Sequence, residues 1–149
     1  MRNIYLLDTN IISQVTRPEP DESLMNNLEL HSGTCAISSI TWFELLSGVA
    51  LLPEGKKKTK LNSFLHDYVK PSFPIIPYDD HAAAINADIT GRLIPKGKPT
   101  PILDTQIASI AIANNMILVT DNKKDFDIFA EQCSLMTENW GKILTRPYK

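Results

Sequence analysis

The sequence predicts an α/β protein, a three-layer α/β/α sandwich around a mostly parallel sheet of about five strands. Short apolar runs alternate with longer segments of helical character, a pattern typical of parallel sheets covered by helices. The first run, IYLL at residues 4–7, is apolar at every position, as expected for a strand buried on both faces. No repeat, linker or low-complexity segment interrupts the pattern, so we expect a single domain over residues 1–149.

The predicted elements follow one another along the chain. Strands are expected at residues 3–8, 34–38, 73–77, 116–120 and 133–137. Helices are expected at residues 9–16, 21–31, 39–52, 56–70, 79–94 and 101–115. Ser38 or Ser39 before ITWFELL and Asp79 before DHAAAI are N-cap residues by type. Thr100 has the same role before Pro101, since proline at the first helical position loses no hydrogen bond.

The composition excludes several classes of protein. With 43% hydrophobic and 21% charged residues the chain is an ordinary globular protein. A net charge of −2 gives no overall basic field, although a local patch would suffice to bind a nucleic acid. Cys35 and Cys133 stand in apolar surroundings, which predicts buried free thiols in a reducing compartment. Without a signal-peptide pattern or a membrane span, we expect a cytoplasmic protein with no membrane contact.

Four acidic residues are expected at one edge of the sheet. Asp8 ends the first strand, and Asp121 follows the strand MILVT. Glu44 lies in the first two turns of the helix after TCAIS, and Asp104 lies in the first turn of the helix opened by Pro101. In a parallel sheet, the carboxyl ends of strands and the amino ends of the following helices share the edge where ligands bind. The four acids are therefore predicted to converge, although they are dispersed in sequence.

Converging carboxylates indicate a site for a divalent cation. Such groups repel one another, and without a cation some would take up protons. No Lys or Arg lies on the segments around Glu44 or Asp104 to pair with them. Oxygen ligands favour Mg²⁺ or Mn²⁺, and a cation held by them polarises a phosphoryl oxygen and lowers the pKa of a bound water. The pattern thus predicts metal-assisted hydrolysis of a phosphate ester.

Each acid also has an ordinary structural role open to it. Asp8 could cap the next helix, Asp104 could favour the helix dipole, and Glu44 could be a solvated helix residue. Asp121 with Asn122 could form a plain turn.

A polyanionic substrate could use the basic residues nearest the acids in sequence: Arg92, Lys96, Lys98, Lys123 and Lys124. The lysine run at residues 56–60 is interpreted as a solvated helix start rather than an RNA-backbone patch.

Four stretches of the chain carry a family resemblance. LLDTNIIS, ISSITWFELLSGV, PILDTQIASIAIANNMILVTDNKKDF and the later ENW resemble, in order and spacing, the PIN-domain ribonucleases of the VapC toxin family. NIISQVTRPEP and GVALLPEGKKKTKL are most similar to the FitB/StbB-like branch. The resemblance implies a PIN fold and an Mg²⁺-dependent endoribonuclease, with Mn²⁺ as a substitute. It also implies a type II toxin paired with a small VapB- or FitA-like antitoxin, RNA as the substrate, and a homodimer.

The resemblance also implies roles for single residues. Asp8, Glu44 and Asp104 match the three family acids, with Asp8 and Asp104 as the principal metal ligands. Thr9 and Asn10 match the polar pair that supports the first acid, and we expect the Thr9 hydroxyl to hydrogen-bond an acid.

The fourth family position is ambiguous in this chain. The family pattern places an Asp or Asn two residues after a Thr. Here Asn122 occupies that position after Thr120, with the acid Asp121 one residue early. Asp121 is the predicted fourth catalytic residue, Asn122 is a supporting alternative, and Asp125 before Phe126 is a weaker one.

Three rival functions follow from the same residues. A phosphatase of the haloacid-dehalogenase type also begins with a strand ending in Asp, but it needs a second acid where this chain has Asn10. A PIN-like protein that acts only by binding a partner would fit a degraded acid set, whereas the three principal acids are present. A nuclease that cuts DNA is the third rival, because fold does not determine substrate.

Overall fold

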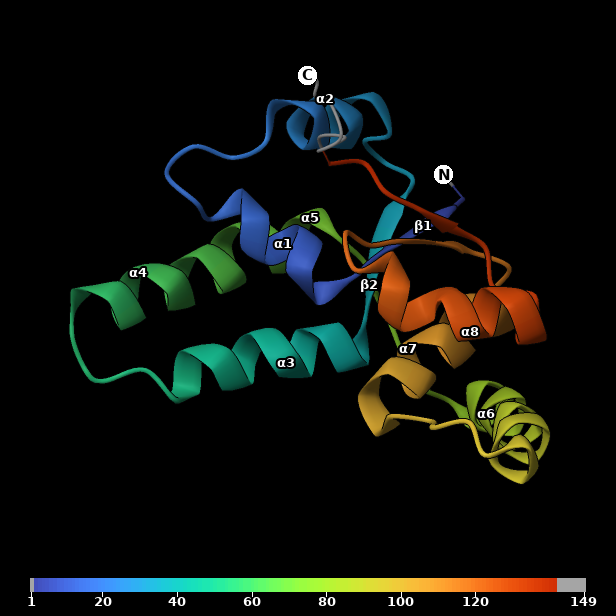
Figure 1. Ribbon diagram of the computed structural model, residues 1–149. Coiled ribbons are helices and arrows are strands. Elements are labelled where there is room, and N and C mark those ends of the chain that lie inside the picture. Colours follow the sequence, from blue (N-terminus) through green and yellow to red (C-terminus); the bar gives the residue numbers. More distant parts are fainter. Residues whose placement is uncertain (1, 142–149) are drawn as a thin grey trace, which may run out of the picture.

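The computed structural model describes residues 2–141 and confirms the predicted α/β/α sandwich (Figure 1). Within these residues the sheet has five parallel strands in the order β3-β2-β1-β4-β5. The strands are β1 (Tyr5–Leu7), β2 (Cys35–Ser38), β3 (Ile75–Ile76), β4 (Ile117–Val119) and β5 (Thr137–Glu138). Met1 and residues 142–149, which the predicted domain included, lie outside the described part of the chain.

Helices cover both faces of the sheet. On one face lie α1 (Thr9–Val15), α2 (Glu22–Leu30), α3 (Ser39–Ala50) and α4 (Lys56–Phe64), which continues through a π-helical turn (Leu65–Val69) into α5 (Lys70–Ser72). On the other lie α6 (Asp80–Leu93), which ends in a 3₁₀ turn (Ile94–Lys96), α7 (Ile102–Ala113) and α8 (Lys123–Cys133). Figure 1 shows the two helical layers on opposite sides of β1 and β2.

The unbroken apolar run of the first strand has a direct cause in the two cores. Successive strand residues point to opposite faces. Leu6 therefore packs in the core beneath α6, α7 and α8, whereas Leu7 packs in the core beneath α1, α3 and α4. Both leucines are fully buried, as are Ile37 and Val119, which pair with Leu7. A central strand of this sheet has no solvent face and so no alternating polar positions.

Most predicted bounds agree with the structure to within two residues, and the predicted caps are largely confirmed. Ser38 caps α3 and Asp79 caps α6, each by accepting a hydrogen bond from a backbone N–H three residues on. The expected cap at Thr100 is wrong. The helix begins one residue later, with Pro101 in the capping position and its carbonyl bonded to both the N–H and the hydroxyl of Thr105.

The helix α8 was not predicted, and the predicted strand at 133–137 overlaps its end. Phe126, Phe129 and Cys133 recur at helical spacing and are buried on its inner face, but the polar opening KKD conceals this pattern. The last strand is confined to Thr137–Glu138, after Ser134 closes the helix in a left-handed conformation.

The two cysteines agree with the prediction of buried thiols. Cys35 and Cys133 are both free and buried. Across residues 2–141, no helix has the length and apolar character to cross a bilayer.

Replacing Leu6 by alanine should destabilise the fold, because Leu6 is 0% exposed at the centre of the sheet. We expect the free energy of unfolding to fall by about 2–5 kcal/mol, measured by urea titration. Leu51→Ala is the matched control, since that leucine is 86% exposed, and its value should stay within about 0.5 kcal/mol of wild type. Equal losses in both variants would contradict this account of the core.

Candidate active site

Asp8 lies where the three central strands of the sheet end. Leu7, the last residue of β1, pairs with Ile37 of β2 and with Val119 of β4. The Asp8 N–H then donates to the Val119 carbonyl at 2.9 Å, which extends the ladder by one bond. Asp8 is thereby fixed at the carboxyl edge of the sheet, beside the first turns of α1 and α3.

The Asp8 carboxylate is only 6% exposed and is held by three donors. It accepts from the Thr9 N–H at 2.8 Å, from Asn10 Nδ2 at 3.1 Å and from Thr120 Oγ1 at 2.9 Å. Burial nevertheless raises the pKa of Asp8 to about 6, with further increases from the charges of Glu44 and Asp104. The bonds from Thr120 and Thr9 oppose that shift. A cation would favour the ionised form that burial penalises.

Glu44 is joined to the start of α1 by a short hydrogen bond. The Thr9 hydroxyl donates to Glu44 Oε1 at 2.6 Å, and its oxygen lies 3.2 Å from Thr41 Oγ1. This bond confirms the expectation that Thr9 hydrogen-bonds an acid. Glu44 is half-buried.

Asp104 approaches the other acids from α7. It lies in the first turn, half-buried above the buried residues Ile107, Ala108 and Ala111. Burial raises the pKa of Asp104, and the charges of Asp125 and Glu44 raise it further. Electrostatic coupling thus links the acid that caps α1 with acids of α3, α7 and the first turn of α8.

One open cavity of about 330 Å³ gathers these groups. It is lined by Asp8, Thr9, Asn10, Ser13, Arg17, Glu44, Asp104 and Asn122. The structure therefore brings together three of the four predicted acids and the three predicted supporting residues.

Asp121 does not line this cavity. It is exposed, and its carboxylate accepts a hydrogen bond from Nε2 of Gln14, a residue of α1 that is 7% exposed. The Asp121 N–H bonds to Asn10 Oδ1 at 3.4 Å. The placement of Asp121 thus differs from the expectation: its side chain fastens the loop after β4 to α1, because Asn10 and Gln14 lie one turn apart on the same helix face.

The two alternatives to Asp121, which are Asn122 and Asp125, are both connected to the acid cavity. Asn122 lines the cavity, its N–H donates to Thr120 Oγ1 at 2.9 Å, and its amide donates to the Asp125 carboxylate. The Thr120 hydroxyl in turn donates to Asp8, so the loop and the first acid are joined through a single side chain.

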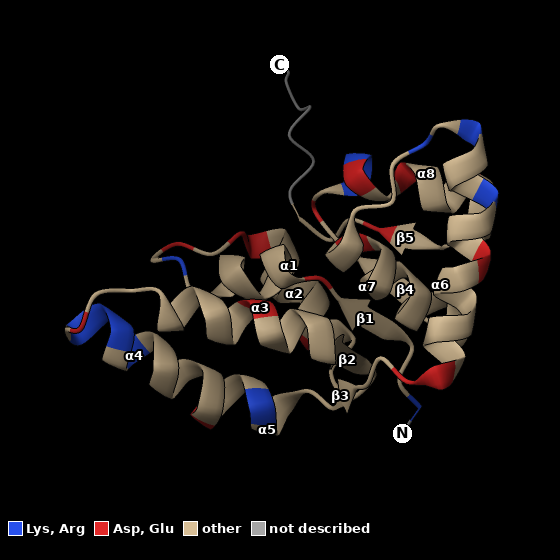
Figure 2. Cartoon of the chain, turned by 90° about the horizontal axis from the view of Figure 1, so that it is seen from below, with Lys and Arg blue, Asp and Glu red and all other residues tan. Residues whose placement is uncertain are grey.

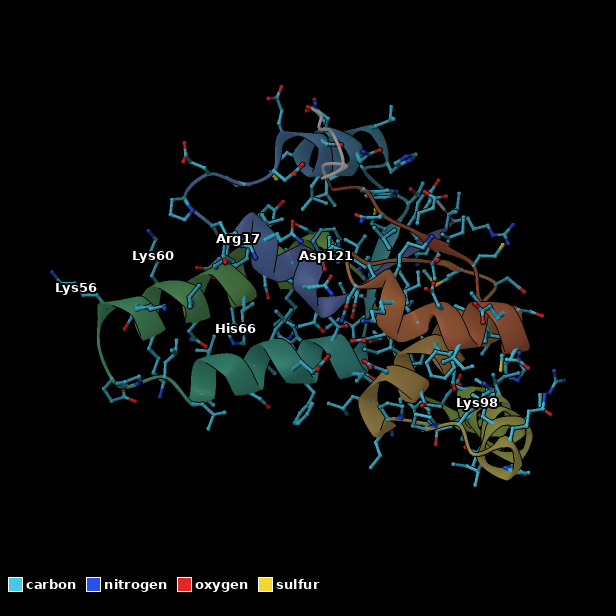
Figure 3. The ribbon with its side chains drawn as sticks, in the orientation of Figure 1. Arg17, Lys56, Lys60, His66, Lys98 and Asp121 are labelled. Carbon is cyan, nitrogen blue, oxygen red and sulfur yellow. The ribbon has the colours of Figure 1, made fainter. Side chains whose placement is uncertain are left out.

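Sequence reasoning missed Arg17 as a cavity residue. Its signal was a spacing of eight from Thr9, which continues the face of α1 beyond the end of the helix at Val15. None of the basic residues expected near the acids lines the cavity. Arg92 instead pairs with Asp88, Lys96 bonds to Gln132, and Lys98 lies beside α6 (Figure 3). The lysine run begins α4, at the end of the molecule opposite α6, as Figure 2 shows.

The donor set suits a hard divalent cation that keeps part of its water. Among residues 2–141, no three His, Cys, Asp or Glu side chains form a ready-made metal cage. Mg²⁺ is usually held by only one or two carboxylates, with waters and substrate phosphate completing its shell. Asp8 and Asp104 meet that requirement, because they line one cavity and the charge of Asp104 further raises the pKa of Asp8.

Comparison with known proteins agrees with this geometry. The family model of the PIN domain matches residues 5–132. The chain belongs to the PIN-domain family. It is 39% identical over 141 residues to Ribonuclease VapC2 of Rickettsia felis, covering 93% of this chain and 99% of that protein. It is 38% identical over 126 residues to Toxin FitB of Neisseria gonorrhoeae, covering 83% of this chain and 91% of that protein.

A solved structure extends the likeness to three dimensions. The structure of FitAB bound to an IR36 DNA fragment matches with a TM-score of 0.79 at 34% identity, covering 96% of this chain and 100% of that one. The predicted resemblance of this PIN-domain chain to VapC and FitB toxins is thus confirmed.

The raised pKa of Asp8 predicts a pH-dependent stability in the presence of chelator. Folded Asp8 keeps its proton up to about pH 6, whereas the unfolded residue loses it near 3.8. The unfolded state therefore binds fewer protons in this window, and the free energy of unfolding should fall by ~2 kcal/mol as the pH rises from about 4 to about 6.

Urea titrations across this pH range measure the effect. The fall should be largely absent in Asp8→Asn and present in Asp121→Asn, which removes an exposed carboxylate nearby. A fall of the same size in Asp8→Asn would assign the effect to another group.

Proposed function

We propose that this chain is a metal-dependent endoribonuclease and the toxin of a VapBC-like toxin–antitoxin module. The observation that carries the proposal is the meeting of Asp8, Glu44 and Asp104 in one open cavity at the carboxyl edge of the sheet. Membership of the PIN-domain family and similarity to a protein named Ribonuclease VapC2 support the reaction class. The three acids of this cavity repel an anionic substrate, and a bound cation would remove that repulsion.

Asp8 and Asp104 would hold Mg²⁺, or Mn²⁺ in its place. When bound, such a cation polarises a phosphoryl oxygen and lowers the pKa of a bound water, so that the water can attack the scissile phosphate. The chain's own contribution is orientation. The three donors to Asp8 fix its carboxylate, and the short bond from Thr9 keeps Glu44 directed at the same space.

Glu44 and a residue of the loop after β4 would complete the shell or orient the water. Asn122 and Asp125 are the residues we propose for the fourth position, because Asn122 lines the cavity and Asp125 acts electrostatically on Asp104. For Asp121 we propose a positioning role, through its bonds to Gln14 and Asn10.

The proposed module includes two protein partners. An apolar cavity of about 250 Å³ between α1, α3 and α4 adjoins the acids and shares Thr9, Ser13 and Glu44 with their cavity. A segment of a VapB- or FitA-like antitoxin seated there would also cover the acids. For a homodimer, the exposed Phe43 of α3 and Ile102 of α7 offer apolar surface on two helices that pack together.

Cleavage of total bacterial RNA by purified, antitoxin-free protein tests the activity. With Mg²⁺ or Mn²⁺ we expect discrete fragments, and with chelator none. Asp104→Asn should lower the rate by more than ~100-fold, because a metal ligand is lost. Asp121→Asn, the matched loss of one carboxylate, should keep the rate within ~10-fold. Matched RNA and DNA oligonucleotides separate a ribonuclease from a DNA nuclease, and absence of metal-dependent cleavage in folded protein would sink the proposal.

A glycine of α3 allows a specific test of the antitoxin site. Gly48 lines the apolar cavity, and a Cβ built there meets nothing within 4 Å. Gly48→Leu should therefore leave the fold intact, fill part of the cavity and weaken binding of the cognate antitoxin at least ~10-fold, measured by calorimetry. Gly91→Leu on α6, equally unobstructed, is the control. Unchanged affinity in Gly48→Leu would place the antitoxin elsewhere.

A further inference from the structure

Arg17 is the only basic residue among the side chains that line the acid cavity in the described part of the chain. It lies two residues after the end of α1, where its N–H donates to the Gln14 carbonyl at 3.2 Å. Figure 3 shows it at the end of α1 that lies away from the sheet. The positively charged side chain of Arg17 faces the same space as the acids, but it reaches that space from the opposite end of α1.

A polar stripe on α1 leads from the acids to Arg17. Thr9 and Ser13 lie one turn apart on α1, and Arg17 lies in the bend two residues after the helix ends at Val15. All three line the cavity, and Thr9 is bonded to Glu44. The stripe therefore begins at the acids and continues outward through a hydroxyl to a guanidinium.

The Arg17 guanidinium is available to a ligand. Arg17 is exposed, and neither of the two ion pairs found among residues 2–141 involves it. Its planar fork of donors matches the oxygens of a phosphate group and can bind two of them at once. The seven residues of α1, which span about 10 Å at ~1.5 Å per helical residue, separate Asp8 from the bend that holds Arg17. Arg17 therefore meets a nucleic acid strand at a different phosphate from the one attacked.

We propose that Arg17 binds a phosphate of the RNA strand adjacent to the scissile one, with the Ser13 hydroxyl on the path between them. Arg17 is thus a positioning residue that holds the strand along α1 and across the acids. This inference rests on the proposed ribonuclease function, and it states the direction in which the substrate backbone crosses the site.

Binding without cleavage provides the first test. In an Asp104→Asn background, the affinity for a short single-stranded RNA is measured by fluorescence anisotropy over a range of salt concentrations. Adding Arg17→Ala should raise the dissociation constant about tenfold, the loss expected for one charge-assisted contact. It should also reduce the slope of log affinity against log salt by about 0.7, the value for one phosphate on a single strand. Arg17→Lys should keep the slope and recover part of the affinity.

Lys98→Ala is the control for a general loss of positive charge. Figure 3 shows Lys98 beside α6, well away from Arg17, so its removal should change neither the affinity nor the slope. Equal effects of Lys98→Ala and Arg17→Ala would overturn the inference, because Arg17 would then act only through the net charge of the protein.

Replacing single phosphates with uncharged methylphosphonates locates the contact. With wild-type protein in metal, neutralising one phosphate beside the scissile bond should raise KM about tenfold with little change in kcat. In Arg17→Ala the same substitution should have no further effect on KM. If the two losses add at every position, Arg17 does not touch the strand and the inference is wrong. If wild-type protein neither binds nor cleaves RNA, the proposed function itself fails.

Discussion

The burial of the Asp8 carboxylate is the constraint on which the site depends. A strand that is apolar on both faces ends in an acid, which the start of α1 and the residue after β4 hold by hydrogen bonds. Donors from Thr9, Asn10 and Thr120 satisfy its oxygens, yet its pKa remains raised to about 6 because burial outweighs their effect. Such a group costs stability in the ionised form, and a bound cation is the means by which proteins offset that cost.

Helix α1 organises the rest of the site around this acid. Thr9 ties Glu44 on α3, while Asn10 and Gln14 tie the loop after β4. The helix is only seven residues long, but its side chains reach two other segments that lie far away in sequence. Through these contacts the helix helps to hold Asp8 and Glu44 at the cavity that Asp104 also lines.

The fold and the principal acids were predictable because they follow from rules that act locally. Apolar runs specify buried strands, and parallel topology alone brings Asp8, Glu44 and Asp104 to one edge. The helix α8 was missed because its polar opening masks the buried Phe126 and Phe129.

The direction in which a side chain points could not be predicted from its spacing in the sequence. Asp121 and Asn122 are adjacent, and only the bond from Gln14, 107 residues away in sequence, decides which of them lines the cavity. Arg17 escaped notice for a related reason: it belongs to a loop in sequence but to the α1 stripe in space.

Calorimetric titration of Mn²⁺ into the metal-free protein at pH 7 tests the central claim most directly, that these acids form a divalent-cation site. The account predicts saturable binding by wild type and by Asp121→Asn, and loss of that binding in Asp8→Asn and Asp104→Asn, with all four proteins folded. Equal binding in all four, or none in wild type, would show that the carboxylates meet at this edge for a reason other than holding a metal.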